Sequence, residues 1–150
     1  MRKEKIHLLH VIGGGEIGGA EQHVLNLLTA LPKDRFQVSL VCLVSGPFAE
    51  LSRQRGIPTH VFPMRHQFDL SPLSQLTRLG REATIDLIHT HGLRANILGR
   101  IAAKRLNIPA VTTVHSSLRH DYLSPYKARI AQILERSTRR LSAGFIAVSQ

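Results

Sequence analysis

Six short apolar runs alternate with longer amphipathic segments along this chain, and that alternation restricts its possible folds more than any other feature. The runs are almost continuously aliphatic or β-branched, as in strands covered on both faces of a parallel sheet; they span residues 6–12, 36–44, 59–63, 86–90, 110–114 and 144–148. Helical spacing of apolar residues marks the segments between them, namely 20–31, 48–55, 71–82, 93–106 and 125–141. Repeated strand–helix alternation predicts a doubly wound, mostly parallel α/β domain of Rossmann-like type.

In such a sheet, ligands gather at the carboxyl ends of the strands. The segments that directly follow the predicted strands are therefore the candidate binding loops, and they comprise residues 13–19, 45–47, 63–69, 91–94, 115–122 and 149–150. The chain stops directly after the last predicted strand, so we expect it to be the first part of a longer protein.

Composition narrows the class of protein. The 150 residues suffice for one domain with a sizeable core, and no apolar run approaches the ~20 residues of a membrane span. The basic and apolar N-terminus is interpreted as a first strand rather than a signal peptide, because histidines interrupt it and glycines follow it, so we expect a cytoplasmic protein. The single cysteine, Cys42, lies in the run VSLVCLV and is predicted to be buried.

The net charge of +10 raises the question of an acidic partner. Aromatic residues make up only 5% of the chain and are not interleaved with the basic ones, so nucleic acid is not expected. Much of the charge falls in one predicted helix and the loop before it, where six basic residues accompany two acids between Arg119 and Arg140. A solvated basic surface and an anionic membrane both remain open as explanations.

The loop after the first predicted strand carries five glycines within residues 13–19 and fits G-x-G-x-x-G. A dinucleotide-binding domain also needs an acidic residue at the end of the second strand, and that strand ends VCLVSGPF without one. An NAD(P)-dependent oxidoreductase therefore remains only as an alternative. The amides of Gly18 and Gly19, at the start of a helix, are predicted to bind a phosphate or a sugar oxygen.

A second group of candidates follows the fourth and fifth predicted strands. His89 and His91 face the same side of an extended segment, and we expect His89 inside the strand while His91 and Arg94 face the ligand. Metal binding by His89 and His91 is an alternative, but no third ligand is visible at a suitable spacing, so no metal is expected. His115 begins the polar loop HSSLRHDY, in which Ser116 and Arg119 are further candidates.

Four segments in this order resemble one family. They are GGGEIGGAEQHVLNLLTAL (13–31), DLIHTHGLRANILGRIAAKRLNIPAVTTVHSS (86–117), the helical segment that runs to 141, and FIAVSQ (145–150). Together they resemble the N-terminal domain of retaining GT-B-type glycosyltransferases of family 4, the large group that uses nucleotide sugars.

The resemblance implies a protein with two Rossmann-like domains, in which residues 1–150 form the N-terminal, acceptor-side domain. The nucleotide-sugar-binding domain, with its Glu–seven residues–Glu motif, is absent from this chain, so we expect the chain alone to be inactive. The implied donor is a UDP- or GDP-linked sugar used without a cofactor or metal, and the implied acceptor is a lipid-linked or cell-envelope glycan.

The resemblance also implies roles for individual residues. His115 corresponds to a cleft histidine that binds the transferred sugar and stabilises the transition state, and Gly18 and Gly19 lie near the donor diphosphate and the acceptor. Because many relatives work at the inner membrane face, we expect peripheral attachment to anionic lipid. A non-catalytic sugar- or phosphate-binding module on the same scaffold is the remaining alternative.

Overall fold

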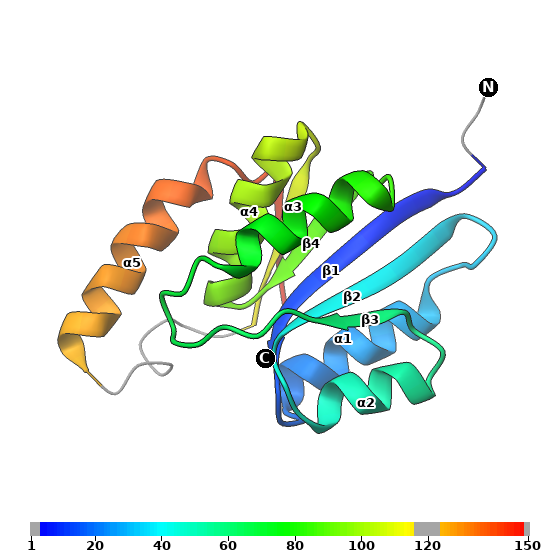
Figure 1. Ribbon diagram of the computed structural model, residues 1–150, viewed down its shortest axis with the longest axis horizontal. Helices are drawn as coiled ribbons and strands as arrows, with labels where there is room; N and C mark the ends of the chain where they lie inside the picture. The colour runs from blue at the N-terminus through cyan, green and yellow to red at the C-terminus, as the bar shows by residue number, and fades with distance from the viewer. Residues whose placement is uncertain (1–3, 116–123, 149–150) are drawn as a thin grey trace.

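The computed structural model describes residues 4–115 and 124–148, which form a six-stranded sheet with helices on both faces. The strands are β1 (Ile6–Gly14), β2 (Phe36–Val44), β3 (Thr59–Val61), β4 (Leu87–His91), β5 (Ala110–Val114) and β6 (Gly144–Ala147). The helices are α1 (Gly19–Ala30), α2 (Pro47–Gln54), α3 (Pro72–Glu82), α4 (Leu93–Leu106) and α5 (Pro125–Arg139) (Figure 1). The strand order is β3-β2-β1-β4-β5-β6 and every pair is parallel, so the predicted α/β fold is confirmed.

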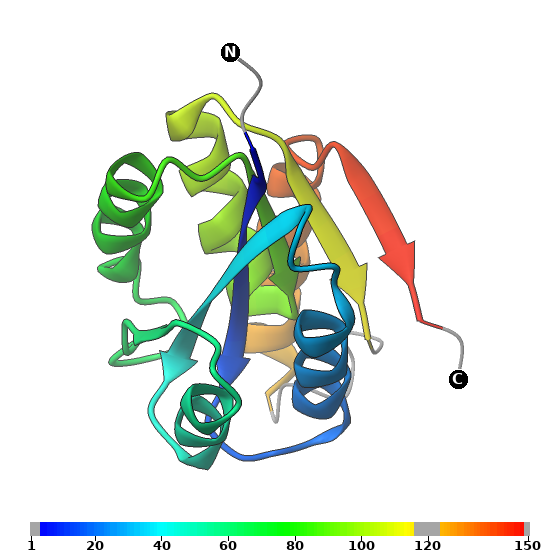
Figure 2. The ribbon, with the colours of Figure 1, turned by 90° about the vertical axis from the view of Figure 1, so that its right-hand side faces the viewer.

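The helices divide between the two faces of the sheet as a doubly wound fold requires. Figures 1 and 2 show α1 and α2 on one face and α3, α4 and α5 on the other. Successive side chains of the central strands point to opposite faces of the sheet and pack into two separate hydrophobic cores. Leu9, Val11 and Ile88 pack with α3 and α4, whereas Ile12 and Cys42 pack with α1 and α2. Cys42 is fully buried, as its apolar run predicts.

Most element positions agree with the periodicity of the sequence, and the differences lie at the edges. β3 has three residues instead of five. Ser124 precedes α5, but its side chain caps nothing, and Pro125 alone marks the start of that helix. Tyr126 and Ile133 follow helical spacing, yet they are 74% and 59% exposed. The reason is that α5 packs mainly on α4 and leaves its other sides open to solvent.

A buried cation ties α4 to α5 and β5. The Arg100 side chain is fully buried, and its guanidinium donates hydrogen bonds to Thr112 Oγ1 (3.2 Å), Thr138 Oγ1 (3.3 Å) and Glu135 Oε1 (2.9 Å). Glu135 is itself only 16% exposed, so the pair is shielded from water. These three partners, on β5 and α5, accept hydrogen bonds from the buried guanidinium and so offset the cost of burying its charge. The contact links α4 to β5 and to α5.

The last residue of β1 and the first residue of the loop after it have a backbone conformation that only glycine adopts easily. Gly14 and Gly15 have φ of +73° and +88°. A Cβ atom on Gly14 would lie 3.1 Å from the Cβ of Cys42, and one on Gly46 would lie 2.6 Å from the carbonyl oxygen of Gly15. The Gly15 carbonyl also accepts a hydrogen bond from the amide of Phe48. The loops after β1 and β2 therefore fix each other's position.

Replacing Glu135 by glutamine should lower the free energy of unfolding by about 3 kcal/mol, because the Arg100 charge stays buried without a counter-charge. Urea denaturation measures the change. Glu82→Gln is the matched control: its partner Arg78 lies 3.9 Å away and both side chains are about 70% exposed. That variant should change stability by less than about 1 kcal/mol, and equal effects of both substitutions would contradict the assigned role of Arg100.

Two neighbouring glycines of the loop should respond differently to alanine. Gly14→Ala should cost about 2 kcal/mol of stability, since an L residue is strained at a positive φ and meets Cys42. Gly13→Ala should be close to neutral, because nothing lies within 4 Å of the added methyl group. Thermal unfolding of the two variants side by side tests the loop geometry, and a stable Gly14→Ala protein would refute it.

Candidate functional site

A pocket lies at the carboxyl ends of β1 and β4, where the order of the strands reverses. Strands β2 and β3 continue on one side of this point and β5 and β6 on the other, so the connections diverge and leave a crevice. The pocket has a volume of about 330 Å³. Its lining comes from the glycine loop, the first turn of α1, and the β4–α4 junction, together with His115 and Val44. The pocket therefore opens at the carboxyl ends of the strands, which is where the sequence predicts the site.

Strand register brings several histidines together beneath the pocket. In the parallel ladders His10 lies opposite His89, Ile12 lies opposite His91, and His91 lies opposite Thr113. Because side chains alternate along a strand, His10, His89, His91 and the position of His115 all face α1. His23 of α1 completes the group, with its ring centroid 5.1 Å from that of His115. These five residues are called the histidine cluster below.

Hydrogen bonds connect most of this cluster. His91 Nε2 lies 3.1 Å from His10 Nδ1, and His91 Nδ1 lies 3.1 Å from His115 Nε2. His89 Nε2 bonds instead to the hydroxyl of Thr113 at 2.6 Å. The first of these links joins β1 to β4, and the second joins β4 to the residue that follows β5, so the cluster spans three strands.

Burial keeps three members of the cluster, His10, His89 and His91, uncharged. Loss of solvent lowers the pKa of His10 to about 3 and that of His89 to about 4, with repulsion between neighbouring imidazoles adding to both shifts. The pKa of His91 is lowered still further by burial and by four surrounding histidines. Burial and His23 also lower the pKa of His115, which is the more accessible member beside the pocket. Near neutral pH the buried histidines are therefore neutral imidazoles.

Three of these histidines satisfy the distance requirement for a metal site. His10, His89 and His91 place ligand nitrogens within 4.8 Å of one another, so the structure supplies a third imidazole that the sequence spacing did not reveal. The rings of His89 and His91 are stacked, however: their planes differ by 29° with centroids 4.2 Å apart. An imidazole ligand points a ring edge at an ion, whereas these two rings meet face to face, and His10 and His91 direct nitrogens at each other. The geometry suits hydrogen bonding better, and the expected absence of a metal stays a prediction.

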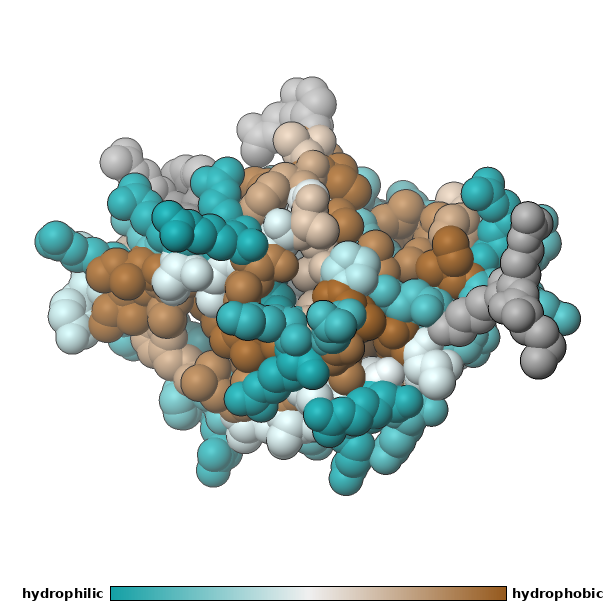
Figure 3. Space-filling model, turned by 90° about the horizontal axis from the view of Figure 1, so that it is seen from above, coloured by the Kyte–Doolittle hydropathy of each residue, from teal (hydrophilic) through white to brown (hydrophobic). Residues whose placement is uncertain are grey.

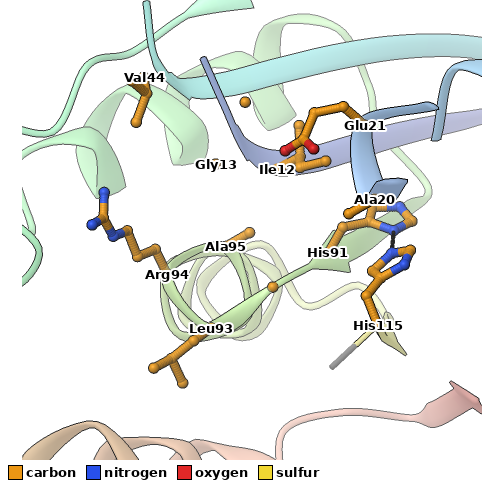
Figure 4. A pocket seen from close by; sticks show the side chains of 12 residues that line it. Ile12, Gly13, Ala20, Glu21, Val44, His91, Leu93, Arg94, Ala95 and His115 are labelled. Atoms are coloured by element: carbon orange, nitrogen blue, oxygen red, sulfur yellow. Dashed lines mark hydrogen bonds between the residues drawn. The ribbon is translucent and has the colours of Figure 1, made fainter. Parts of the chain in front are cut away.

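Arg94 lies across the pocket from the histidines. Figure 4 shows its side chain leaving the start of α4 on the side opposite the His91–His115 pair. No carboxylate of residues 4–115 or 124–148 forms an ion pair with it. Arg94 also lines a second, more apolar cavity of about 290 Å³ beside α4 and α5. A cation so placed can bind an anionic group on a ligand in the pocket.

The start of α1 lines the pocket through other residues than the predicted Gly18 and Gly19. Gly18 and Gly19 are the N-cap and first residue of α1, and the lining residues are their neighbours Ala20 and Glu21. The Gly18 amide donates a hydrogen bond to Glu21 Oε2 at 3.1 Å. The amide expected to bind a phosphate thus already has an anionic partner within its own helix.

The predicted site residues fall into three groups. The structure brings His91, Arg94 and His115 to one pocket, although His91 is only 1% exposed and offers its nitrogens to other imidazoles rather than to a ligand. Gly18 and Gly19 lie beside this pocket, and Ser116 and Arg119 lie outside the described residues. Sequence reasoning missed His10, His23 and Glu21; the polar residue inside the apolar run IHLLHVI was the available signal for His10.

Comparison with known proteins identifies the family. Residues 17–150 match the model of Glycosyltransferase Family 4. An Escherichia coli UDP-Gal:α-D-GlcNAc-diphosphoundecaprenol α-1,3-galactosyltransferase is 32% identical over 116 residues, which is 74% of this chain and 30% of that enzyme.

Solved structures share the fold. Anabaena HepE in complex with UDP superposes with a TM-score of 0.76 at 24% identity, over 97% of this chain and 38% of HepE. Acinetobacter baumannii MurG gives a TM-score of 0.70 at 16% identity, over 97% of this chain and 42% of MurG. The chain therefore spans about a third of the length of the relatives named first, and it belongs to glycosyltransferase family 4.

Proposed function

We propose that this chain is the acceptor-side domain of a retaining glycosyltransferase that moves a sugar from a nucleotide donor to a lipid-linked or cell-envelope acceptor. The observation that carries the proposal is the pocket at the β1–β4 switch point, which His115 and Arg94 both line beside a glycine loop. Family membership supports transferase chemistry, and we infer that a second domain of the protein would bind most of the nucleotide.

The residues around the pocket suit transfer with retention of configuration. In that reaction the bond between the sugar and the diphosphate breaks and positive charge develops on the sugar. The acceptor oxygen then bonds to the same sugar carbon on the same face, and the departing phosphate takes the proton of the acceptor hydroxyl. Groups that donate hydrogen bonds to the oxygens carrying negative charge lower the barrier. His115 supplies one such donor at the edge of the pocket, and Arg94 supplies a cation for a phosphate or carboxylate of either substrate.

The relatives suggest the substrate classes. The galactosyltransferase is named for a UDP-linked donor and an acceptor carried on diphosphoundecaprenol, and HepE was solved with UDP. We infer a nucleotide-sugar donor, with UDP favoured over GDP, and a lipid-linked acceptor. No metal is assigned to the reaction, because the pocket lining has one carboxylate, Glu21, and the cation Arg94 rather than several carboxylates to hold a divalent cation.

His115→Ala in the protein with its natural termini should lower kcat by about 100-fold with the correct nucleotide sugar, since it removes a hydrogen-bond donor aimed at developing charge. Steady-state kinetics on a panel of UDP- and GDP-sugars, with NAD and NADP as further candidate ligands, makes the measurement. His60→Ala on the edge strand β3 is the control and should keep normal turnover. Normal kcat in His115→Ala would remove this residue from the mechanism, and binding of NAD in place of nucleotide sugars would favour the oxidoreductase alternative.

The outer face of α5 supports attachment to a membrane surface. Tyr126, Arg129, Ile133, Arg136 and Arg140 recur at intervals of three and four residues, so they share one face, and all are exposed. Figure 3 shows hydrophobic side chains among hydrophilic ones at the end of the molecule where α5 lies. None of the helices in the described parts of the chain is long and apolar enough to cross a bilayer. Such a face suits contact with anionic lipid headgroups instead.

The double variant Arg136→Glu/Arg140→Glu should abolish co-sedimentation with anionic liposomes at low salt, because each surface cation contributes about 1 kcal/mol of attraction. Lys104→Glu/Arg105→Glu is a matched control, with the same change of charge at the end of α4. It should leave most of the binding intact. Equal loss in both variants would point to net charge alone, and binding by neither variant nor parent would contradict the proposed attachment.

A further inference from the structure

The histidine cluster contains a continuous hydrogen-bonded chain of three imidazoles that ends at the pocket. His91 bonds through Nε2 to His10 and through Nδ1 to His115, at 3.1 Å in both cases. His10 and His91 are each only 1% exposed, whereas His115 lines the pocket. We propose that His10 is a positioning residue which, acting through His91, holds His115 as the tautomer that carries its proton on Nδ1.

Only two proton arrangements fit such a chain of neutral rings. Each neutral imidazole has one N–H donor and one bare nitrogen acceptor, so both bonds of His91 must run in the same direction. Either protons point from His10 toward His115, or they point from His115 toward His10. The choice fixes which nitrogen of His115 remains for a ligand.

The buried end of the chain selects the direction. His10 Nε2 has no hydrogen-bond partner among the described residues. If protons pointed toward His10, this nitrogen would carry an N–H sealed in the core, and unpaired buried N–H groups are rarer in proteins than unpaired acceptors. With protons pointing outward, only a lone pair is left unmatched. His10 Nδ1 then donates to His91 Nε2, and His91 Nδ1 donates to His115 Nε2.

The packing around the chain preserves this arrangement. The His89 ring stacks on His91 at 4.2 Å between centroids and is itself fixed by Thr113, so His91 has little freedom to turn over. On the α1 side His23 meets the edge or face of His115, and Glu21 lines the same pocket. His89, His23 and Glu21 are therefore the titratable groups of β1, β4 and α1 that face the chain of imidazoles, apart from its own three members.

The chain determines what His115 can do. Its Nε2 lone pair accepts from His91, and its Nδ1 carries a proton, so neither nitrogen is available to remove a proton from an acceptor. What remains is an N–H donor, which suits an oxygen of the transferred sugar or of the leaving phosphate. This consequence for turnover rests on the proposed function, whereas the tautomer itself does not.

Nitrogen-15 NMR of the protein labelled at histidine tests the tautomer directly. The two ring nitrogens of a neutral histidine differ strongly in chemical shift according to which is protonated, so the nine histidines can be assigned by single substitutions. We expect His115 and His91 to be protonated at Nδ1 at neutral pH. Protonation of His115 at Nε2 in the parent protein would overturn the proposal without any variant.

Substitution of His10 tests the positioning role. His10→Leu should release His115 into a mixture of tautomers and lower kcat by about tenfold with little change in KM, as when an outer partner of a functional imidazole is lost. His10→Asn should restore both, because its amide nitrogen can donate to His91 from the place of Nδ1. His7→Leu, on the same strand but bonded to the Ala83 carbonyl, is the control and should leave His115 unchanged.

The two readouts separate this proposal from the proposed function. An unchanged His115 tautomer in a folded His10→Leu protein overturns the positioning role whatever the activity. If His115→Ala keeps full turnover, the catalytic role of His115 fails, while the NMR result still decides whether His10 sets the tautomer. If His10→Leu does not fold, the parent spectrum and His10→Asn decide the question.

Discussion

The parallel pairing of β1 with β4 is the contact on which the rest of this molecule depends. It joins the two halves of the sheet where the strand order reverses, and it opens the crevice at the carboxyl ends of those strands. The same register sets His10 against His89 and brings His91 within reach of both His10 and His115. One pairing therefore creates the pocket and also arranges the side chains beneath it.

Polar groups are buried on both faces of the sheet, but the two faces accommodate them differently. On the α4 side, Glu135 and two threonine hydroxyls accept hydrogen bonds from the buried guanidinium of Arg100. On the α1 side, burial lowers the pKa values of His10 and His91, so these rings do not take up a second proton and are neutral. The first solution adds a charge pair that anchors α5, and the second leaves neutral rings whose hydrogen bonds can have a fixed direction.

Local patterns in the sequence predict the helices and strands of this fold well, because the spacing of apolar residues within one segment determines whether that segment is a helix or a strand. A short, near-continuous apolar run such as the one around Cys42 favours a strand covered on both faces, and helical spacing of apolar residues marks the helices between such runs. The order of the strands is not local information. His10 and His91 are separated by 81 positions, and no spacing rule shows that their strands are neighbours. The sequence therefore predicts His91, Arg94 and His115, because their segments follow strands that end at the same edge of the sheet. It does not reveal His10, which lies buried beneath them.

The Gly18 amide shows a further limit of pattern reasoning, because a helix start rich in glycine does not reveal whether its donors are in use. Glu21, three residues on, bonds to that amide and already supplies the negative charge that the helix end attracts. A phosphate arriving at this amide has to exchange with a carboxylate rather than enter a vacant place. Its affinity there would measure the difference between two anions, so a doubly charged diphosphate would be favoured over a singly charged sugar acid.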